Sequence, residues 1–296
     1  MICVLNLTSD CLNFREEVMT VKITIVCENS VGRAIPAIGE HGFACWIEND
    51  GKQYLVDSGQ GLGIINNVQV LGLSFDKLNA LVLSHGHYDH ADGLGPVLRR
   101  TKEIDVFAHP DIFSPRYSKS GQSLRFVGIS HRRELLETLG ANFKFTPEFE
   151  QVAPNLYVTG QVPRSNNFEV GDKNLVQRTA TGEYVSDPFN DDMAVALDTP
   201  RGLLVVLGCA HAGIINTLDH ICQKFNRNQI YAVVGGTHLG PVSAAQFDAT
   251  VTALKKFDIQ KFGVSHCTGQ TRAAMLRNEY GKKFFFGSVG AVLEID

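Results

Sequence analysis

Four strong metal-binding side chains fall within six residues, directly after an apolar, strand-like run. The run covers residues 81–83 and stops at Ser84. Imidazole nitrogen and carboxylate oxygen suit zinc and related divalent metals. Side chains at two-residue spacing converge only where the chain leaves the strand and coils around a centre, and Gly86 permits that path. The pattern therefore predicts a metal site at a strand end, with these ligands: His85, His87, Asp89 and His90.

The pattern H-x-H-x-D-H after a strand resembles the signature of the metallo-β-lactamase superfamily. The resemblance implies an α+β fold: a four-layer αββα sandwich of two mixed sheets flanked by helices, with one or two metals at one edge. It assigns His85 and His87 to metal one and Asp89 and His90 to metal two, with Asp89 also catalytic. The implied cofactor is one or two divalent ions, zinc first, with iron or manganese as alternatives. His87 at the second position favours hydrolytic chemistry over reduction of oxygen or nitric oxide.

The same resemblance supplies two further positions. The superfamily has an early strand that ends in Asp-x-Gly, and Asp57 matches it in Val-Asp-Ser-Gly. This carboxylate would accept hydrogen bonds from metal ligands and orient them. A last histidine ligand follows a late strand in the family, and His266 matches it in Val-Ser-His-Cys-Thr-Gly. His266 would complete metal two.

The second half of the chain departs from the family pattern. The usual third histidine of metal one falls at Asn-Asp-Asp (190–192), and the usual bridging aspartate falls at Gly-Cys-Ala-His (208–211). A weak internal repeat of residues 81–87 at 205–211 puts Cys209 in register with His85 and His211 with His87. We expect Cys209 to bind metal as a thiolate, and His211 to replace the missing imidazole and act in catalysis. Asp191 and Asp192 stay open as alternative ligands.

Two other histidines differ in their sequence context. His238 follows a strand-like run in Gly-Gly-Thr-His-Leu, and we predict a catalytic role for it. It would contact substrate, hold the outer nitrogen of a ligand, or bind metal. His41 is predicted to be a surface or packing residue.

Three longer motifs resemble one branch of the superfamily, the dihydropterin-ribofuranosylaminobenzene phosphate synthases. They are Gly-Cys-Ala-His-Ala-Gly-Ile-Ile-Asn (208–216), Gly-Gly-Thr-His-Leu (235–239) and Ser-His-Cys-Thr-Gly (265–269). The resemblance extends over about residues 21–296. A shared fold does not fix a shared substrate, so the branch name alone does not identify the reaction.

Composition bounds the class of protein. The 296 residues are 44% hydrophobic and 20% charged, which fits one large globular domain over 21–296. Residues 1–20 are predicted to be a poorly integrated extension, with Met19 as an alternative start.

The net charge of −4 gives no general attraction to nucleic acid or anionic membranes. No apolar run approaches the ~18 residues of a membrane span. Seven cysteines without framework spacing indicate reduced thiols and a cytoplasmic protein.

Strand-like and helix-like runs alternate in both halves of the chain. The clearest helix is 244–257, since Ser243 is a good N-cap and apolar residues follow helical spacing. A helix is also predicted over 61–73. This alternation favours two packed sheets covered by helices.

A basic segment interrupts this acidic chain. Residues 112–133 contain five lysines and arginines and no acid. We predict that 111–135 is a lid insertion in which Arg132 and Arg133 bind a phosphate. A polar loop over 161–192 would form the other wall. A plain solvated loop is the alternative for the basic segment.

Together these features predict a metal-dependent hydrolase that acts on a phosphorylated or heteroaromatic small molecule. One alternative is a transferase or synthase that joins a dihydropterin to an aminobenzene ribofuranosyl phosphate. Another is a non-catalytic, metal-containing protein that binds a ligand. We expect a small-molecule partner, no membrane and no nucleic acid, and a homo-oligomer stays open.

Overall fold

The structure is a computed structural model that describes residues 19–295. Most of the predicted N-terminal extension, with Cys3 and Cys11, lies outside the described residues. The five described cysteines are free, in line with the expectation of reduced thiols. Within residues 19–295, no helix has the length and apolar character needed to cross a membrane.

The first sheet has seven strands and carries the H-x-H-x-D-H segment at one end of β4. Strands β1 to β3 and β18 pair antiparallel, whereas β3, β4, β5 and β8 run parallel, so the sheet is mixed. The strand order is β18 (Val292–Ile295), β1 (Val21–Cys27), β2 (Ala44–Asn49), β3 (Lys52–Val56), β4 (Leu78–Val82), β5 (Ile104–Ala108) and β8 (Ala141–Phe145).

The second sheet repeats this plan with the second half of the chain. Strands β14 to β17 pair parallel, and β9, β10, β13 and β14 pair antiparallel. The order is β17 (Phe284–Phe286), β16 (Asp258–Ser265), β15 (Gln229–Gly236), β14 (Gly202–Leu207), β13 (Ala194–Thr199), β10 (Leu156–Val158) and β9 (Glu150–Ala153).

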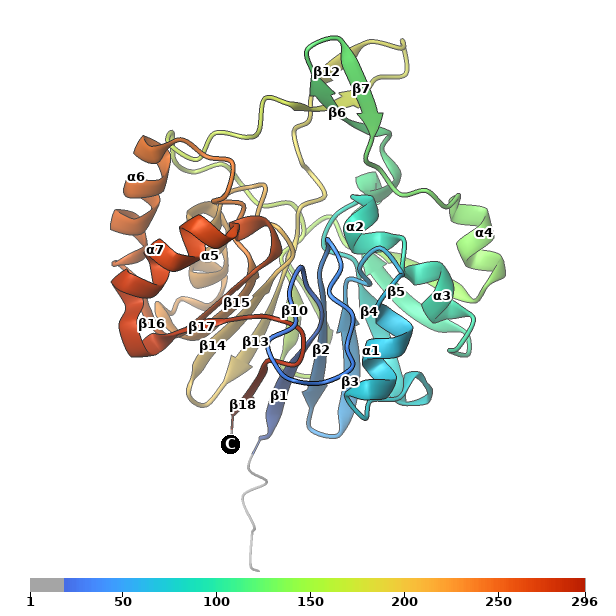
Figure 1. Ribbon diagram of the computed structural model, residues 1–296, viewed down its shortest axis with the longest axis horizontal. Coiled ribbons are helices and arrows are strands. Elements are labelled where there is room, and N and C mark those ends of the chain that lie inside the picture. Colours follow the sequence, from blue (N-terminus) through green and yellow to red (C-terminus); the bar gives the residue numbers. More distant parts are fainter. Residues whose placement is uncertain (1–18, 296) are drawn as a thin grey trace, which may run out of the picture.

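The two sheets pack face to face, with helices on both outer faces (Figure 1). Side chains alternate along each strand. In β2, Cys45 and Ile47 enter the core between the sheets, whereas Ala44 and Trp46 pack under helices. The predicted αββα sandwich is thus confirmed. The covering helices are α1 (Ile64–Val70), α3 (Leu94–Leu98) and α4 (Arg133–Thr138) on the first sheet, and α5 (Ile214–Phe225), α6 (Ala244–Leu254) and α7 (Gln270–Tyr280) on the second.

Two predicted helices are present but shorter than expected. Ser243 accepts a hydrogen bond from the Gln246 amide, so it caps α6 as predicted. Helix α1 ends before Gly72, which has φ of 72° and cannot continue a right-handed helix. The short elements are α2 (Tyr88–Ala91), η1 (Phe75–Lys77), η2 (Pro110–Phe113), η3 (His266–Thr268) and η4 (Gly281–Lys283).

A third, four-stranded sheet projects beyond the sandwich (Figure 1). Its strands come from the basic segment and the polar segment, which were predicted as a lid and a loop. Strand β6 pairs with β11, so the two segments are parts of one sheet. The order is β12 (Tyr184–Ser186), β11 (Leu175–Arg178), β6 (Arg116–Ser120) and β7 (Ser123–Phe126).

Candidate metal centre

Ligand-type side chains gather where strands of both sheets end. Strand β4 ends at Val82, and in the second sheet β14, β15 and β16 end at Leu207, Gly236 and Ser265. A histidine or cysteine follows within a few residues of each end. The fold therefore brings together residues that lie more than a hundred positions apart in the chain.

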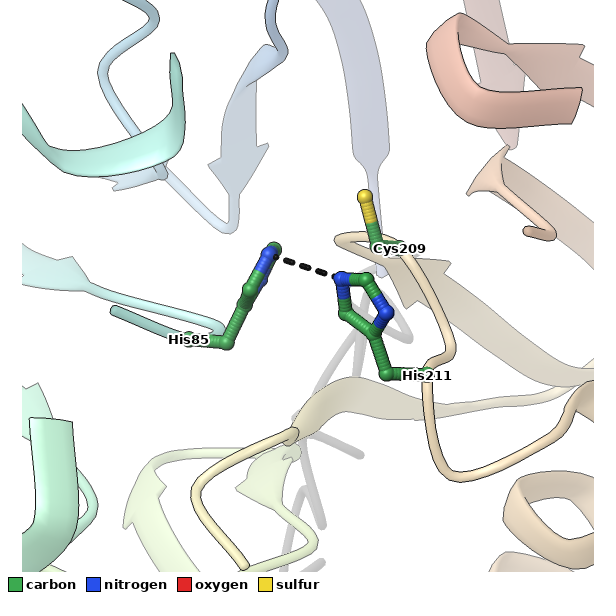
Figure 2. A group of neighbouring side chains, drawn as sticks. All are labelled: His85, Cys209 and His211. Atoms are coloured by element: carbon green, nitrogen blue, oxygen red, sulfur yellow. Dashed lines mark hydrogen bonds between the residues drawn. The ribbon is translucent and has the colours of Figure 1, made fainter. Parts of the chain in front are cut away.

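The first group consists of three histidines and a cysteine. The Nε2 atom of His85 lies 3.0 Å from Nδ1 of His87 and 3.2 Å from Nε2 of His211. The ligand atoms of His85, Cys209 and His211 all lie within 4.8 Å of one another. Figure 2 shows the His85 and His211 rings facing each other, with Cys209 on the same loop as His211.

The second group shares Cys209 with the first. Its Sγ atom lies 3.2 Å from Nε2 of His90, and His266 joins both within 4.8 Å. The Asp89 carboxylate contacts the same histidine, with Oδ2 3.3 Å from Nε2 of His266. The thiol therefore stands between two sets of ligands, at the position where the family pattern has a bridging carboxylate.

Asp57 orients ligands of both groups. Its Oδ2 accepts hydrogen bonds from Nδ1 of His90 and Oγ of Ser84, both at 2.7 Å, and Oδ1 accepts from the Ser84 amide at 2.7 Å. Ser84 Oγ in turn lies 2.9 Å from Nδ1 of His85. Because the Ser84 hydroxyl donates its hydrogen to Asp57, the Ser84 oxygen can accept a hydrogen bond from Nδ1–H of His85. Both histidines therefore make these contacts through Nδ1 and direct Nε2 inward, where a bound metal would take the place of its proton.

His266 is oriented in the same way by Asn29, whose Oδ1 lies 2.8 Å from its Nδ1. Three buried imidazoles, of His85, His90 and His266, thus direct Nε2 toward the centre, where a bound metal would take the place of any proton on that nitrogen. Imidazole nitrogen, thiolate sulfur and carboxylate oxygen form a donor set that zinc and similar metals prefer. The residues present therefore fit the metal centre that the fold implies.

Electrostatics in the first group favour neutral ligands. Burial lowers the pKa of His85 and His211 well below the usual value, and that of His87 to about 3. These imidazoles are unprotonated at neutral pH, as a metal ligand must be. Burial raises the pKa of the Cys209 thiol, so a nearby cation would be needed to hold it as thiolate.

The two open alternatives, Asp191 and Asp192, support the backbone and lie outside the candidate ligand groups. Asp191 accepts from Arg116 at 2.5 Å and from the Gly86 amide at 2.8 Å. Asp192 accepts from the Ala212 amide at 2.9 Å. Each carboxylate therefore fixes a loop that carries ligands: Gly86 lies between two histidines, and Ala212 follows His211.

The structure does not bring Arg132 and Arg133 to the centre. Arg133 Nε pairs with Glu137 at 2.7 Å, and its guanidinium lies 4.9 Å from the Phe145 ring centroid. Both arginines stand at the start of α4, against edge strand β8. Net charge along a segment could not reveal these partners. The basic residue that does reach the centre is Arg116, which is buried.

Another arginine of the segment lies beside the H-x-H-x-D-H loop. Arg125 Nη1 is 3.4 Å from the hydroxyl of Tyr88, and the guanidinium lies 5.7 Å from the centre of that ring. The Tyr88 amide donates to the Val127 carbonyl at 3.0 Å. Strand β7 is therefore attached to the turn between His87 and Asp89.

Histidines 238 and 41 flank the two groups. The His238 ring centre lies 4.2 Å from that of His211, and neither of its ring nitrogens has a hydrogen-bond partner among the described residues. His41 Nε2 lies 3.2 Å from Asp89 Oδ2. The prediction that His41 is only a surface or packing residue was therefore incomplete. It is half-exposed but contacts a candidate ligand, and no local pattern in the sequence pointed to this.

Backbone strain marks the same region. Asp57, Ala210, His238 and His266 adopt positive φ angles of 58°, 55°, 50° and 49°, although none is glycine. Such residues usually cluster at functional sites, because the surrounding structure must hold them.

A cavity of about 750 Å³ opens beside the first group. Its Phe189 wall stacks on the His211 ring at 4.2 Å between centroids, and Arg164, another wall residue, donates to the His211 carbonyl at 2.9 Å. The volume suits a small-molecule ligand. Other wall residues are Glu148, Gln161, Glu169, Lys173 and Asn190.

Comparisons with known proteins agree with this architecture. The family model described as the metallo-beta-lactamase superfamily matches residues 38–165. A Methanocaldococcus jannaschii protein named 7,8-dihydropterin-6-methyl-4-(beta-D-ribofuranosyl)-aminobenzene-5'-phosphate synthase is 28% identical over 90% of this chain and 94% of its own. An uncharacterized protein of the same organism is 31% identical over 92% of this chain and all of its own.

A solved structure extends the likeness to the whole fold. The crystal structure of Tm1679, described as a metal-dependent hydrolase of the beta-lactamase superfamily, superposes with a TM-score of 0.80. It is 27% identical and covers 93% of this chain and 99% of that one. The chain belongs to the metallo-β-lactamase superfamily.

Proposed function

We propose that the protein is a hydrolase that uses two divalent metal ions, zinc first and iron or manganese as alternatives. The observation that carries the proposal is the position of Cys209 between two sets of inward-facing ligands. His85, His87 and His211 would hold the first ion. Asp89, His90 and His266 would hold the second, and Cys209 would serve both. A pair of ions so held would lower the pKa of a water molecule to about 7 and offset charge that develops on an attacked phosphorus or acyl carbon.

The residues around the ions have separate tasks. Although burial opposes it, hydrogen bonds from His266 and His41 hold the pKa of Asp89 well below its usual range. Its carboxylate is therefore ionised at neutral pH and can accept a hydrogen bond from water. His238 has two buried ring nitrogens without a hydrogen-bond partner among the described residues, and its ligand atom lies within 4.8 Å of those of Cys209 and Cys267, so it would bind metal or contact a substrate beside His211. Buried Phe189 covers His211 and helps to exclude water from the first group.

We infer a phosphorylated or heteroaromatic small molecule as the substrate. The cavity beside His211 supports a small ligand. The name of the 28% identical relative contains an aminobenzene ribofuranosyl phosphate, which supports a phosphorylated compound. Arg125, beside Tyr88 in the turn between His87 and Asp89, is a suitable cation for an anionic substrate.

A synthase is the second candidate, because that relative is named as one. It would join a dihydropterin to an aminobenzene ribofuranosyl phosphate on the same centre. A non-catalytic ligand-binding protein is the third candidate, since the usual bridging aspartate is replaced by Cys209.

The test is turnover of bis(p-nitrophenyl) phosphate by zinc-, manganese- and iron-loaded protein. The proposal predicts release of p-nitrophenol that requires metal and is lost in a His85→Ala/His87→Ala variant. A loaded protein without turnover on this ester and on a panel of small phosphoesters would reject the hydrolase. Product formation from a dihydropterin and the aryl phosphate would then identify the synthase.

A further inference from the structure

The loop that carries Cys209 and His211 leads directly into α5, and that helix has no cap of its own. Gly213 occupies the N-cap position with φ of 98° and offers no side chain. The first turn also lacks an acidic residue. The first N–H groups of a helix have no partner within it, so these amides require an acceptor from elsewhere in the chain.

Glu169 supplies that acceptor from a distant segment. Its Oε1 accepts from the Ile215 amide and its Oε2 from the Asn216 amide, both at 2.8 Å. Asn166 Nδ2 donates to Oε2 at 2.8 Å, which holds the carboxylate in place. A side chain at Gly213 would collide with the Glu169 side chain, so this glycine makes room for the contact.

The same segment is tied to the loop at two more points. Asn216 Nδ2 donates to the Ala212 carbonyl at 2.8 Å, while its Oδ1 accepts from the Ser165 amide at 2.8 Å. Arg164 donates to the carbonyls of His211 and Pro188, each at 2.9 Å. Residues 164–169, here called the strap, therefore bond to the His211 carbonyl and to the first turn of α5 that follows it.

We infer that Glu169 is a positioning residue of the metal centre. By capping α5 it holds the strap against the Cys209–His211 loop, and this contact fixes the positions of Cys209 and His211, the two ligands that the second sheet contributes to the first group. The inference rests on the proposed function, because it concerns the affinity of that group for metal. Partners that orient metal ligands typically contribute 10- to 100-fold in affinity.

The experiment compares Glu169→Gln, Glu169→Ala and a control, Glu150→Gln. Glu150 is exposed on β9 and makes no side-chain hydrogen bond or ion pair among the described residues. Competition with a chelator measures the affinity for each zinc ion, and cobalt substitution reports the thiolate through its charge-transfer band. We expect Glu169→Ala to weaken the first ion by about 10- to 100-fold and to change the cobalt band. Glu169→Gln, which keeps one acceptor oxygen, should lie between it and the wild type.

Wild-type affinity and an unchanged cobalt band in both Glu169 variants would overturn the inference. If Glu169→Ala does not fold, the Glu169→Gln result decides. If the wild-type protein binds no metal, the proposed function fails, and hydrogen exchange in the metal-free protein tests the strap alone. Faster exchange of the amides of residues 209–216 in Glu169→Gln than in Glu150→Gln would support the lock, and equal exchange would overturn it.

Discussion

The Cys209 sulfur lies 3.2 Å from Nε2 of His90, although the two residues are 119 positions apart. The same sulfur lies within 4.8 Å of ligand atoms of His85 and His211. A thiol so placed can serve two ions at once. A thiolate is also softer and more easily oxidised than the carboxylate it replaces.

Cys209 should therefore make the protein sensitive to oxidation. We expect mild peroxide to lower activity and a reductant to restore it, because a sulfenate or disulfide no longer serves as the shared ligand. Cys209→Ser should bind metal more weakly and lose the peroxide sensitivity. Cys267→Ser is the necessary control, since Cys267 Sγ lies 3.5 Å from the Cys209 carbonyl oxygen. If Cys209→Ser kept both the metal affinity and the peroxide sensitivity of the wild type, Cys209 would be an ordinary core thiol.

The His90–Asp57 pair predicts how the metal-free protein responds to pH. Burial alone would lower the pKa of His90, but the Asp57 carboxylate raises it from 6.5 to about 9. A raised folded-state pKa adds stability that is fully present below about 6.5 and is lost as the pH rises through about 9. The shift corresponds to about 3 kcal/mol. Chelator-treated protein should therefore become less stable to denaturant between these pH values.

Asp57→Asn should remove this pH dependence, because an amide does not stabilise the imidazolium ion. Asp198→Asn is the control, since Asp198 pairs with Arg227 at the surface. A stability profile that is the same in Asp57→Asn and the wild type would show that His90 is not charged in the metal-free protein.

Arg125 and the pair Arg132–Arg133 should differ in their effect on substrate. Arg125→Ala should raise KM for an anionic substrate and leave metal content unchanged, because Arg125 lies at Tyr88 beside the second group. Arg132→Ala/Arg133→Ala should leave KM unchanged, since Arg133 is engaged by Glu137 and Phe145. If Arg132→Ala/Arg133→Ala raised KM and Arg125→Ala did not, the pair would bind the substrate phosphate, as the sequence predicts.

Arg116 should be essential for stability. Its guanidinium is buried between Asp187 at 2.8 Å and Asp191 at 2.5 Å. Removing one partner leaves a buried charge uncompensated, which typically costs 3–5 kcal/mol. Arg116→Ala should lower the free energy of unfolding by about this amount, measured with urea. A change below about 1 kcal/mol would show that water reaches these carboxylates.

Local pattern was sufficient to predict the sandwich and to select candidates for much of the centre. H-x-H-x-D-H after a strand names a family, and alternating runs predict the sheets. The repeat of 81–87 at 205–211 pointed to Cys209 and His211 because both segments follow equivalent strands. The structure places both beside His85, so the sequence register of the two segments correctly indicated which residues lie together.

Contacts between distant segments could not be predicted in this way. Glu169 lies 46 positions before the amide of Ile215 that it caps, and no motif connects them. The charge of residues 112–133 favours Arg132 and Arg133 as phosphate ligands, but charge along the sequence does not reveal that Glu137 pairs with Arg133. The pairing of β6 with β11 depends on tertiary structure, since the sequence of each segment alone predicts a polar loop and no strand.

The most direct test is the metal content of the protein after zinc loading and gel filtration. The wild type should retain two ions per chain, and His85→Ala/His87→Ala should lose at least the first. A control variant, His109→Ala/His220→Ala, alters two histidines outside the candidate ligand groups and should retain both ions. Full metal content in His85→Ala/His87→Ala would contradict the proposed metal centre.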